Sequence, residues 1–186
     1  LEQAVASKQV TAVDSTRVHT KLVADVLLLN EEILGEFGMA LDPDTDTYFL
    51  IQAALANMPL LGESLGIIRA KGTGYLAANA LPLDGKGELL QLAKRTREVG
   101  GEMLRNFQRA TKANPNIEKD LGAKAQASKV LVEKTLALAD SALISATEYK
   151  YPAVAYFDEY TRAIDSLYDF NAVALETLKT ALDDRQ

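Results

Sequence analysis

Three aspartates, Asp42, Asp44 and Asp46, alternate with other residues in a spacing that begins like a calcium-binding loop. An EF-hand loop takes oxygen ligands from positions 1, 3 and 5, and it requires glycine at position 6 and glutamate at position 12. Counting from Asp42 puts Thr47 at position 6 and Ala53 at position 12, so both requirements fail. The sequence therefore predicts no calcium site in this stretch.

The same residues fit the start of a helix. Asp42 can cap the helix with Pro43 at its first position, where the missing N–H of proline costs nothing. Asp44 is the other possible cap, because its side chain can accept a hydrogen bond from the backbone N–H of Asp46 or Thr47. The remaining carboxylates face the positive end of the helix dipole, which stabilises them by ~0.3–1 kcal/mol each. We therefore expect a helix to begin here.

Other chemistry has few residues to draw on. The chain of 186 residues holds one histidine, His19, and no cysteine, which excludes a thiolate site or a multi-histidine zinc site within one chain. The motifs GxSxG and HExxH and the phosphate-binding P-loop are absent. A net charge of -6 argues against a nucleic-acid surface, which is usually basic. We expect no catalytic residues, no cofactor, no metal and no nucleic-acid partner.

Apolar residues recur at helical spacing along nearly the whole chain, and no alternating strand pattern of useful length occurs. Steps of three and four residues predict five helices of roughly 25–37 residues, or ~40–55 Å each. Gly38, the stretch 80–88, Asn114 to Asn116 and the stretch 149–153 interrupt the pattern. The apolar stripes are Val18, Leu22, Val26, Leu29, Ile33 and Phe37; Thr47, Ile51, Ala54, Met58, Leu61, Leu65 and Ile68; Leu89, Leu92, Thr96, Val99, Met103, Phe107 and Ala110; Leu121, Ala125, Val132, Leu136, Ala139 and Leu143; and Tyr160, Ile164, Leu167, Asn171, Ala174, Leu178 and Leu182.

The connections between these predicted helices are short, so sequential neighbours are expected to run antiparallel. The sequence thus predicts an all-α fold, an elongated antiparallel up-down bundle of about five long helices that spans residues 1–186 as a single domain. Pro59 lies inside the second helix, where it removes one backbone hydrogen bond and should kink the helix near Leu55. No run reaches the ~18–20 apolar residues that cross a bilayer.

His19 and Arg69 are the candidate ligand-binding pair. His19 lies 23 residues before Asp42 in the predicted turn, and Arg69 lies 27 residues after it. In an antiparallel pair of helices these distances place the two side chains within about one turn of the same level. Together they could clamp a carboxylate, because a guanidinium forms two parallel hydrogen bonds with one. The structural alternative is a surface ion pair for Arg69 and an ordinary helix-face position for His19.

Tyr48, Tyr160 and Thr161 are the other polar residues near apolar stripes, and we include them as candidate ligand-binding residues. The structural alternative for the two tyrosines is an edge position with the hydroxyl in water. Asn171 falls on the last stripe, where a buried amide could set the register between subunits. Four glycines would allow close helix approach or a small cavity: Gly62, Gly66, Gly100 and Gly101.

Two longer stretches carry a resemblance to a known group of proteins. The stretch 161–186 resembles the last sensor helix of bacterial transmembrane receptors, and the stretch 18–72 is similar to a segment that recurs in the helical extracytoplasmic domains of methyl-accepting chemotaxis proteins, sensor histidine kinases and diguanylate cyclases. Residues 80–150 match only by their helical pattern. The matching features of 18–72 are His19-Thr20, the Asp42-Pro43-Asp44 entry with Asp46 and Tyr48, Met58-Pro59, and Gly66 followed by Arg69 and Gly72.

The resemblance implies a ligand-sensing periplasmic domain, itself not an enzyme, of a receptor anchored in the bacterial inner membrane. The parent receptor could carry a kinase or cyclase domain, and the sensor would pass binding to that cytoplasmic output as a helix displacement. The resemblance also implies a homodimer, and the His19–Arg69 geometry adds a small anionic organic ligand. Five antiparallel helices would leave the two chain ends at opposite poles, so an odd number of further helices is expected upstream in the parent.

Two other functions remain open on the sequence. The first is a structural or adaptor bundle that binds a protein partner and no small molecule. The second and weaker one is a helical enzyme with a carboxylate metal site, whose expected Glu-x-x-His pairs are absent because the chain has one histidine.

Overall fold

The structure, a computed structural model, describes residues 12–184, and every regular element in that range is a helix. The absence of strands from the described residues confirms the all-α class. Within these residues η1 is a 3-10 helix, and η2 and η3 are π-helical segments. The elements in chain order are α2 (Ala12–Glu36), η1 (Met39–Leu41), α3 (Thr45–Ile51), η2 (Gln52–Asn57), α4 (Met58–Ala78), α5 (Leu83–Ala113), α6 (Pro115–Ala139), η3 (Asp140–Ile144) and α7 (Ala153–Asp183).

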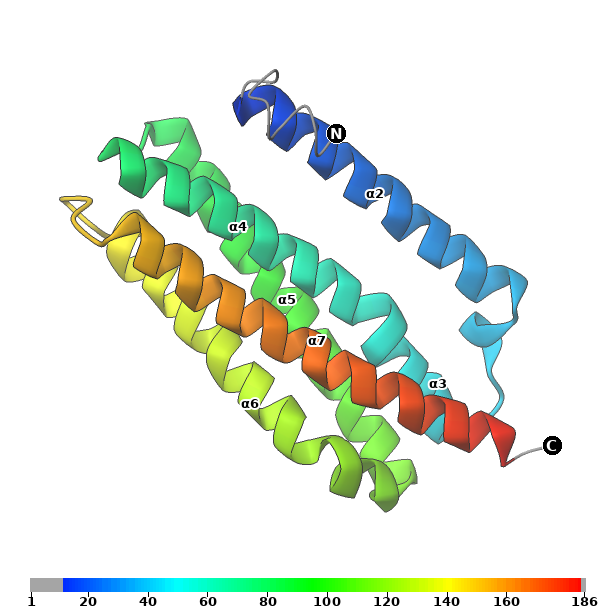
Figure 1. The fold of residues 1–186 in the computed structure, drawn as a ribbon. Helices are drawn as coiled ribbons and strands as arrows, with labels where there is room; N and C mark the ends of the chain where they lie inside the picture. The colour runs from blue at the N-terminus through cyan, green and yellow to red at the C-terminus, as the bar shows by residue number, and fades with distance from the viewer. Residues whose placement is uncertain (1–11, 185–186) are drawn as a thin grey trace.

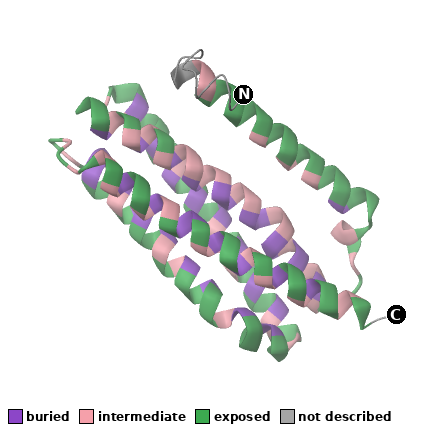
Figure 2. Cartoon of the chain, in the orientation of Figure 1, coloured by how far each residue is buried: buried purple, intermediate pink, exposed green. Residues whose placement is uncertain are grey.

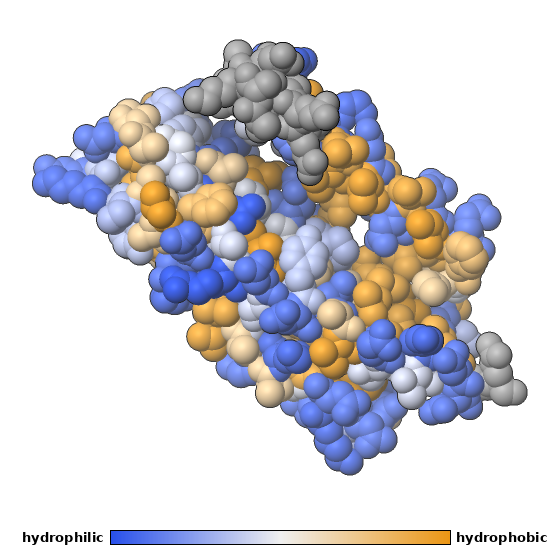
Figure 3. Space-filling view, in the orientation of Figure 1, coloured by the Kyte–Doolittle hydropathy of each residue, from blue (hydrophilic) through white to orange (hydrophobic). Residues whose placement is uncertain are grey.

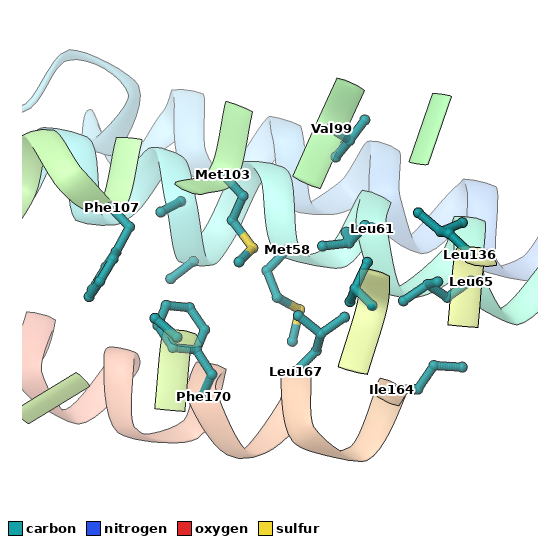
Figure 4. Close-up of a cluster of buried hydrophobic side chains, with 14 of the residues drawn as sticks. Met58, Leu61, Leu65, Val99, Met103, Phe107, Leu136, Ile164, Leu167 and Phe170 are labelled. Atoms are coloured by element: carbon teal, nitrogen blue, oxygen red, sulfur yellow. The ribbon is translucent and has the colours of Figure 1, made fainter. Parts of the chain in front are cut away.

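The core lies between four long rods that run side by side (Figure 1): α3–η2–α4, α5, α6 with η3, and α7. α3, η2 and α4 form one continuous rod, α5 packs against it, and α7 packs against both α4 and α6. Buried residues line the inner faces of these rods, while most residues on the outer faces are exposed (Figure 2). Figure 4 shows the centre of this core, where Met58 and Leu61 of α4 meet Met103 of α5 and Leu167 of α7.

The periodicity of the second predicted helix identifies its buried face correctly. All seven residues of its predicted stripe are buried, from Thr47 to Ile68. The predicted breaks also coincide with helix ends, since α5 ends at Ala113 and α6 begins at Pro115. Asn114 caps α6, because its side-chain oxygen accepts a 3.1 Å hydrogen bond from the backbone N–H of Asn116.

α2 stands apart from the four rods (Figure 1), and its predicted stripe is not a core face. All six residues of that stripe are exposed, with exposed fractions that run from 41% at Val18 to 76% at Phe37. The neighbouring face is partly buried instead, at Val23, Leu27 and Asn30, and fully buried only at Leu34. The space-filling view accordingly shows apolar surface along α2 (Figure 3). The interpretation of residues 18–37 as a buried stripe is therefore wrong, because α2 has neighbours on one side only.

The acidic stretch starts a helix, as its residue types predicted. α3 begins at Thr45 with Asp44 as the N-cap residue, but the capping hydrogen bond expected at the Asp44 side chain is not formed. The backbone N–H of Thr47 donates instead to the Asp46 carboxylate at 2.9 Å. The carboxylate of Asp42 accepts hydrogen bonds from the backbone N–H of Asp44 at 3.0 Å and from the hydroxyl of Thr47 at 2.7 Å. Asp46 is tied to the junction of α5 and α6, since Asn114 donates a 3.0 Å hydrogen bond to its carboxylate. These oxygens are used to fix the turn that leads into the α3–η2–α4 rod.

By length and composition, the helix Thr45–Ala78 could cross a membrane. Half of its most apolar window is buried inside the protein, and the core helix of a bundle passes the same test. This corrects the expectation that no segment of the chain is apolar enough over such a length. The finding is weak evidence for a span, because burial within the bundle explains the apolar composition.

Candidate functional site

A pocket of about 400 Å³ opens between α5 and α6, and it reaches Leu61 of α4 and Leu167 of α7 at its floor. This volume lies at the small end of the range for ligand-binding cavities, about 300–1,000 Å³. The pocket therefore touches all four rods of the bundle. Its lining residues are Leu61, Thr96, Arg97, Gly100, Gly101, Met103, Leu104, Ser128, Lys129, Val132, Glu133, Leu136, Ala137 and Leu167.

Two adjacent glycines open the space on the α5 side. A Cβ atom at Gly100 would lie 3.6 Å from Leu61 Cδ1, at ordinary contact distance, so a side chain there would point toward the floor of the pocket. Of the two alternatives given for these glycines, close helix approach or a small cavity, Gly100 and Gly101 fit the cavity. Gly62 and Gly66 do not line the pocket.

The polar side chains inside the pocket bond to their own surroundings. Thr96 donates a 2.7 Å hydrogen bond to the carbonyl of Leu92, which is one turn earlier in α5. Ser128 donates to the carbonyl of Ser166 in α7 at 2.9 Å. Both hydroxyl protons are therefore already used within the protein. The other walls of the pocket are mainly Leu, Val and Met side chains.

Three charged residues lie at the mouth of the pocket: Arg97 on α5, and Lys129 and Glu133 on α6. Their formal charges sum to +1, although the chain as a whole carries -6. Lys129 Nζ lies 3.9 Å from Glu133 Oε1, and both side chains are substantially exposed, so this ion pair is weak. Arg97 is exposed and makes no ion pair with any other residue between 14 and 184.

The structure brings together two of the residues proposed from sequence, Arg69 and Thr161. The Arg69 guanidinium donates a 2.9 Å hydrogen bond to the Thr161 hydroxyl, which itself donates to the carbonyl of Phe157 at 2.9 Å. The guanidinium also lies 4.6 Å from the centre of the Phe157 ring. This cluster joins α4 to α7, and the sequence offered no signal for Phe157 because contacts between separate helices leave no local pattern.

His19 is not part of that cluster. It is exposed on α2, where its ring Nδ1 donates a 2.7 Å hydrogen bond to the carbonyl of Ser15. Arg69 reaches toward α7, so the two do not form the carboxylate clamp that their positions along the chain suggested. The physical reason is the position of α2, whose residues 16–22 are all exposed rather than packed against α4.

The two candidate tyrosines have different surroundings. Tyr160 is fully buried, and its hydroxyl donates a 2.8 Å hydrogen bond to the carbonyl of Thr135. The alternative of an edge position with the hydroxyl in water is therefore wrong for Tyr160. Tyr48 is half-buried and packs edge-to-face on Phe49, with 5.1 Å between the ring centres. Neither residue lines the pocket.

Tyr156 lies beside Tyr160, with 4.8 Å between the ring centres, and it is also fully buried. Burial raises the pKa of Tyr156 to about 12, with a smaller opposing effect from the Tyr160 hydroxyl. Burial, followed by the Tyr156 neighbour, raises the pKa of Tyr160 as well. Both tyrosines are therefore neutral core residues at physiological pH.

A second hollow, of about 310 Å³, lies where the start of α6 meets the end of α7. Its walls include the carboxylates of Asp120, Glu176 and Asp184. Within residues 14–184 no group of three or more carboxylates and histidines is arranged to hold a metal ion. This polar hollow accordingly lacks the converging ligands of a metal centre.

Comparisons of the sequence with known protein families and with curated proteins, and of the fold with solved structures, found no match.

Proposed function

We propose that this chain is the ligand-sensing domain of a bacterial transmembrane signalling receptor, built as an antiparallel bundle of about five helices. The pocket between α5 and α6 is the observation that carries the proposal. A helical bundle without catalytic motifs or a metal site among its described residues, but with a mainly apolar cavity at its centre, fits binding better than catalysis. The domain itself is non-catalytic, and any kinase or cyclase activity belongs to the parent protein.

The position of the pocket fits a mechanical signal. Its floor includes Leu167 of α7, and its walls belong to α5 and α6. A ligand that fits one packing of these helices better than another would shift the balance between the two packings. Packed helices change position in discrete steps, by small translations or rotations, so α7 could pass the shift toward its C-terminal end. In the proposed receptor this end leads to the membrane and the cytoplasmic output, and the sensor lies in the periplasm.

The exposed stripe on α2 supports the proposed homodimer. A parallel, in-register pair of α2 helices would place each apolar residue of the stripe against its copy, and both C-terminal ends would lie on the same side. Sedimentation of the protein tests this arrangement: Val26→Glu should dissociate the dimer. Leu90→Glu, at a residue of α5 that is 49% exposed, is the matched control and should leave the dimer intact. A monomeric wild type would contradict the homodimer.

Thermal-shift screening of the purified domain against organic acids, amino acids and aromatic acids tests the sensing function. Stabilisation by one class of compound is expected, and it should disappear when the pocket is filled by Gly100→Leu. Gly74→Leu is the matched control, because Gly74 is an exposed glycine of α4 and a Cβ added there would meet no atom within 4 Å. A flat screen, or stabilisation that survives Gly100→Leu, would contradict the sensor and favour the adaptor bundle that binds only protein.

A further inference from the structure

The mouth of the α5–α6 pocket differs in charge from the rest of the protein. Arg97 and Lys129 belong to opposite walls, and the net charge of the mouth is positive on a chain of net charge -6. Arg97 precedes Gly100 and Gly101 by three and four residues, so it lies on the same face of α5 as the glycines that open the pocket. Lys129 precedes Val132 by three residues and shares its face of α6 in the same way.

The interior of the pocket favours an apolar group of a ligand. Leu61, Val132, Leu136 and Leu167 come from α4, α6 and α7, and the hydroxyls of Thr96 and Ser128 are already bonded to carbonyls. Figure 4 shows the Leu61, Leu136 and Leu167 side chains within one apolar cluster. A hydrogen-bond acceptor of a ligand placed among these side chains would lose its hydrogen bonds to water without gaining a donor, because both hydroxyl protons are already used.

The charged residues at the mouth of the pocket favour a ligand with a single negative charge. The Arg97 guanidinium has no carboxylate partner between residues 14 and 184, and Lys129 has only the loose 3.9 Å contact with Glu133. A carboxylate of a ligand would accept charge-assisted hydrogen bonds from the two cations, and it would compete with the Glu133 carboxylate for Lys129. A dianion would in addition meet the negative charge of Glu133.

From these contacts we infer that the pocket binds an amphipathic monoanion, with its apolar body among the leucines and its carboxylate between Arg97 and Lys129. The inference rests on the proposed sensing function and specifies its ligand class. The carboxylate of the ligand would contact both α5 and α6, while its apolar body would contact α4 and α7. Aromatic acids and short fatty acids share this chemistry, and binding measurements with one of each separate them.

Isothermal titration calorimetry with four probes tests the ligand class. The monoanions are 3-phenylpropionate and octanoate, the neutral match is 3-phenylpropionamide, and the polar dianion is succinate. At least one monoanion should bind, and the amide and succinate should bind at least about tenfold more weakly, since the charge-assisted hydrogen bonds are lost or opposed. Preference between phenylpropionate and octanoate tells an aromatic acid from an aliphatic one.

Four variants assign the binding to this pocket. Arg97→Gln and Lys129→Gln should each weaken binding of the monoanion about tenfold and leave the amide unchanged. Glu133→Gln should strengthen binding of the monoanion, because it removes the competing carboxylate. Lys94→Gln is the matched control: its side chain is 80% exposed on α5, outside the pocket, and the substitution changes the net charge equally.

The outcomes separate the ligand class from the function. If the amide binds as tightly as the acid and Arg97→Gln has no effect, while Gly100→Leu abolishes both, the pocket binds ligands and the monoanion is the wrong class. If none of the four probes binds, the monoanion is overturned, and the broader screen then decides the sensing function. If a monoanion binds equally to wild type and Gly100→Leu, the binding site lies elsewhere, and both proposals fail.

Discussion

The side-chain amide of Asn30 donates a 2.7 Å hydrogen bond to the backbone carbonyl of Leu55, in the π-helical segment η2. Pro59 lies four residues after Leu55 and has no N–H, so it cannot supply the ordinary α-helical hydrogen bond to this carbonyl. The helix widens to π geometry just before the proline, and a residue of α2 provides the missing donor. The proline thus leaves a free carbonyl on η2 for Asn30. Among the described residues, this is the one hydrogen bond that joins α2 to η2 or α4.

Asn30→Leu should loosen α2. The carbonyl of Leu55 loses its donor, and leaving a partly buried carbonyl unpaired costs about 1–3 kcal/mol. Hydrogen exchange should therefore speed up across residues 12–36 while the four rods keep their protection. Pro59→Ala restores an N–H to the rod, so the Asn30 substitution should cost less in that background. Equal costs in both backgrounds would contradict the link between the proline and Asn30.

Gly72 and Gly74 lie two residues apart in α4 and should respond oppositely to alanine. A Cβ at Gly72 would lie 2.5 Å from ring atoms of Tyr156, which is fully buried and has no room to withdraw. A Cβ at Gly74 meets nothing within 4 Å. Gly72→Ala should therefore destabilise the protein by about 1–3 kcal/mol through overpacking. Gly74→Ala should stabilise it by up to about 1 kcal/mol through helix propensity, and urea unfolding measures both.

Arg69 and Thr161 should be energetically coupled. Thr161→Val removes the hydroxyl that accepts the Arg69 hydrogen bond while it keeps the side-chain shape. Arg69→Ala removes that bond and the contact with the Phe157 ring, and a double-mutant cycle should give a coupling of about 1 kcal/mol. Arg109→Ala is the control, because Arg109 lies 5.1 Å from the centre of the Phe49 ring, in a different part of the bundle. Its cycle with Thr161→Val should give no coupling.

Tyr156 should make the protein sensitive to alkali. Burial holds its pKa near 12, above the ordinary value of about 10, so the stability of the neutral form is complete below pH ~10 and is lost as the pH rises through about 12. Tyr156→Phe should lose less stability than wild type over this range. At pH 7 the Tyr156→Phe substitution should change the free energy of unfolding little, because the Tyr156 hydroxyl has no hydrogen-bond partner among the described residues.

Tyr160→Phe is the comparison for that experiment. Its hydroxyl bonds to the Thr135 carbonyl, so its removal should cost about 1 kcal/mol at pH 7. Denaturant unfolding at pH 7, and again between pH 10 and 12, separates the two tyrosines. Equal losses for both phenylalanine variants at pH 7 would contradict the difference in hydrogen bonding.

Glu63 should lower stability at neutral pH. Burial raises the pKa of its carboxyl group, so the folded protein favours the protonated form. The stability gained from that form is complete below the unfolded-state pKa and is lost as the pH rises through the higher folded-state pKa. Glu63→Gln should therefore raise the melting temperature at pH 7 and change it less at pH 4. Glu102→Gln, at an exposed residue of α5, should show no such pH-dependent gain.

Local patterns were sufficient for two features of the helices, one buried face and one helix end. The stripe from Thr47 to Ile68 was predicted as a buried face, and it is buried. The break at Asn114 was equally clear, since an amide cap followed by proline is a local signal. The kink expected near Leu55 coincides with η2, but its π geometry and its donor from α2 were not readable from the sequence.

The sequence by itself determined where the helices run, because helical periodicity, capping residues and prolines act within a few residues of one another. Only the tertiary structure decided which face of α2 is covered. Val23 and Leu34 lie toward the bundle, and Val26 remains exposed, because two apolar faces overlap on one helix and its neighbours select between them. The pocket was decided in the same way: Arg97 and Lys129 lie on different helices, and the spacing between packed helices is written in no single stretch of the chain.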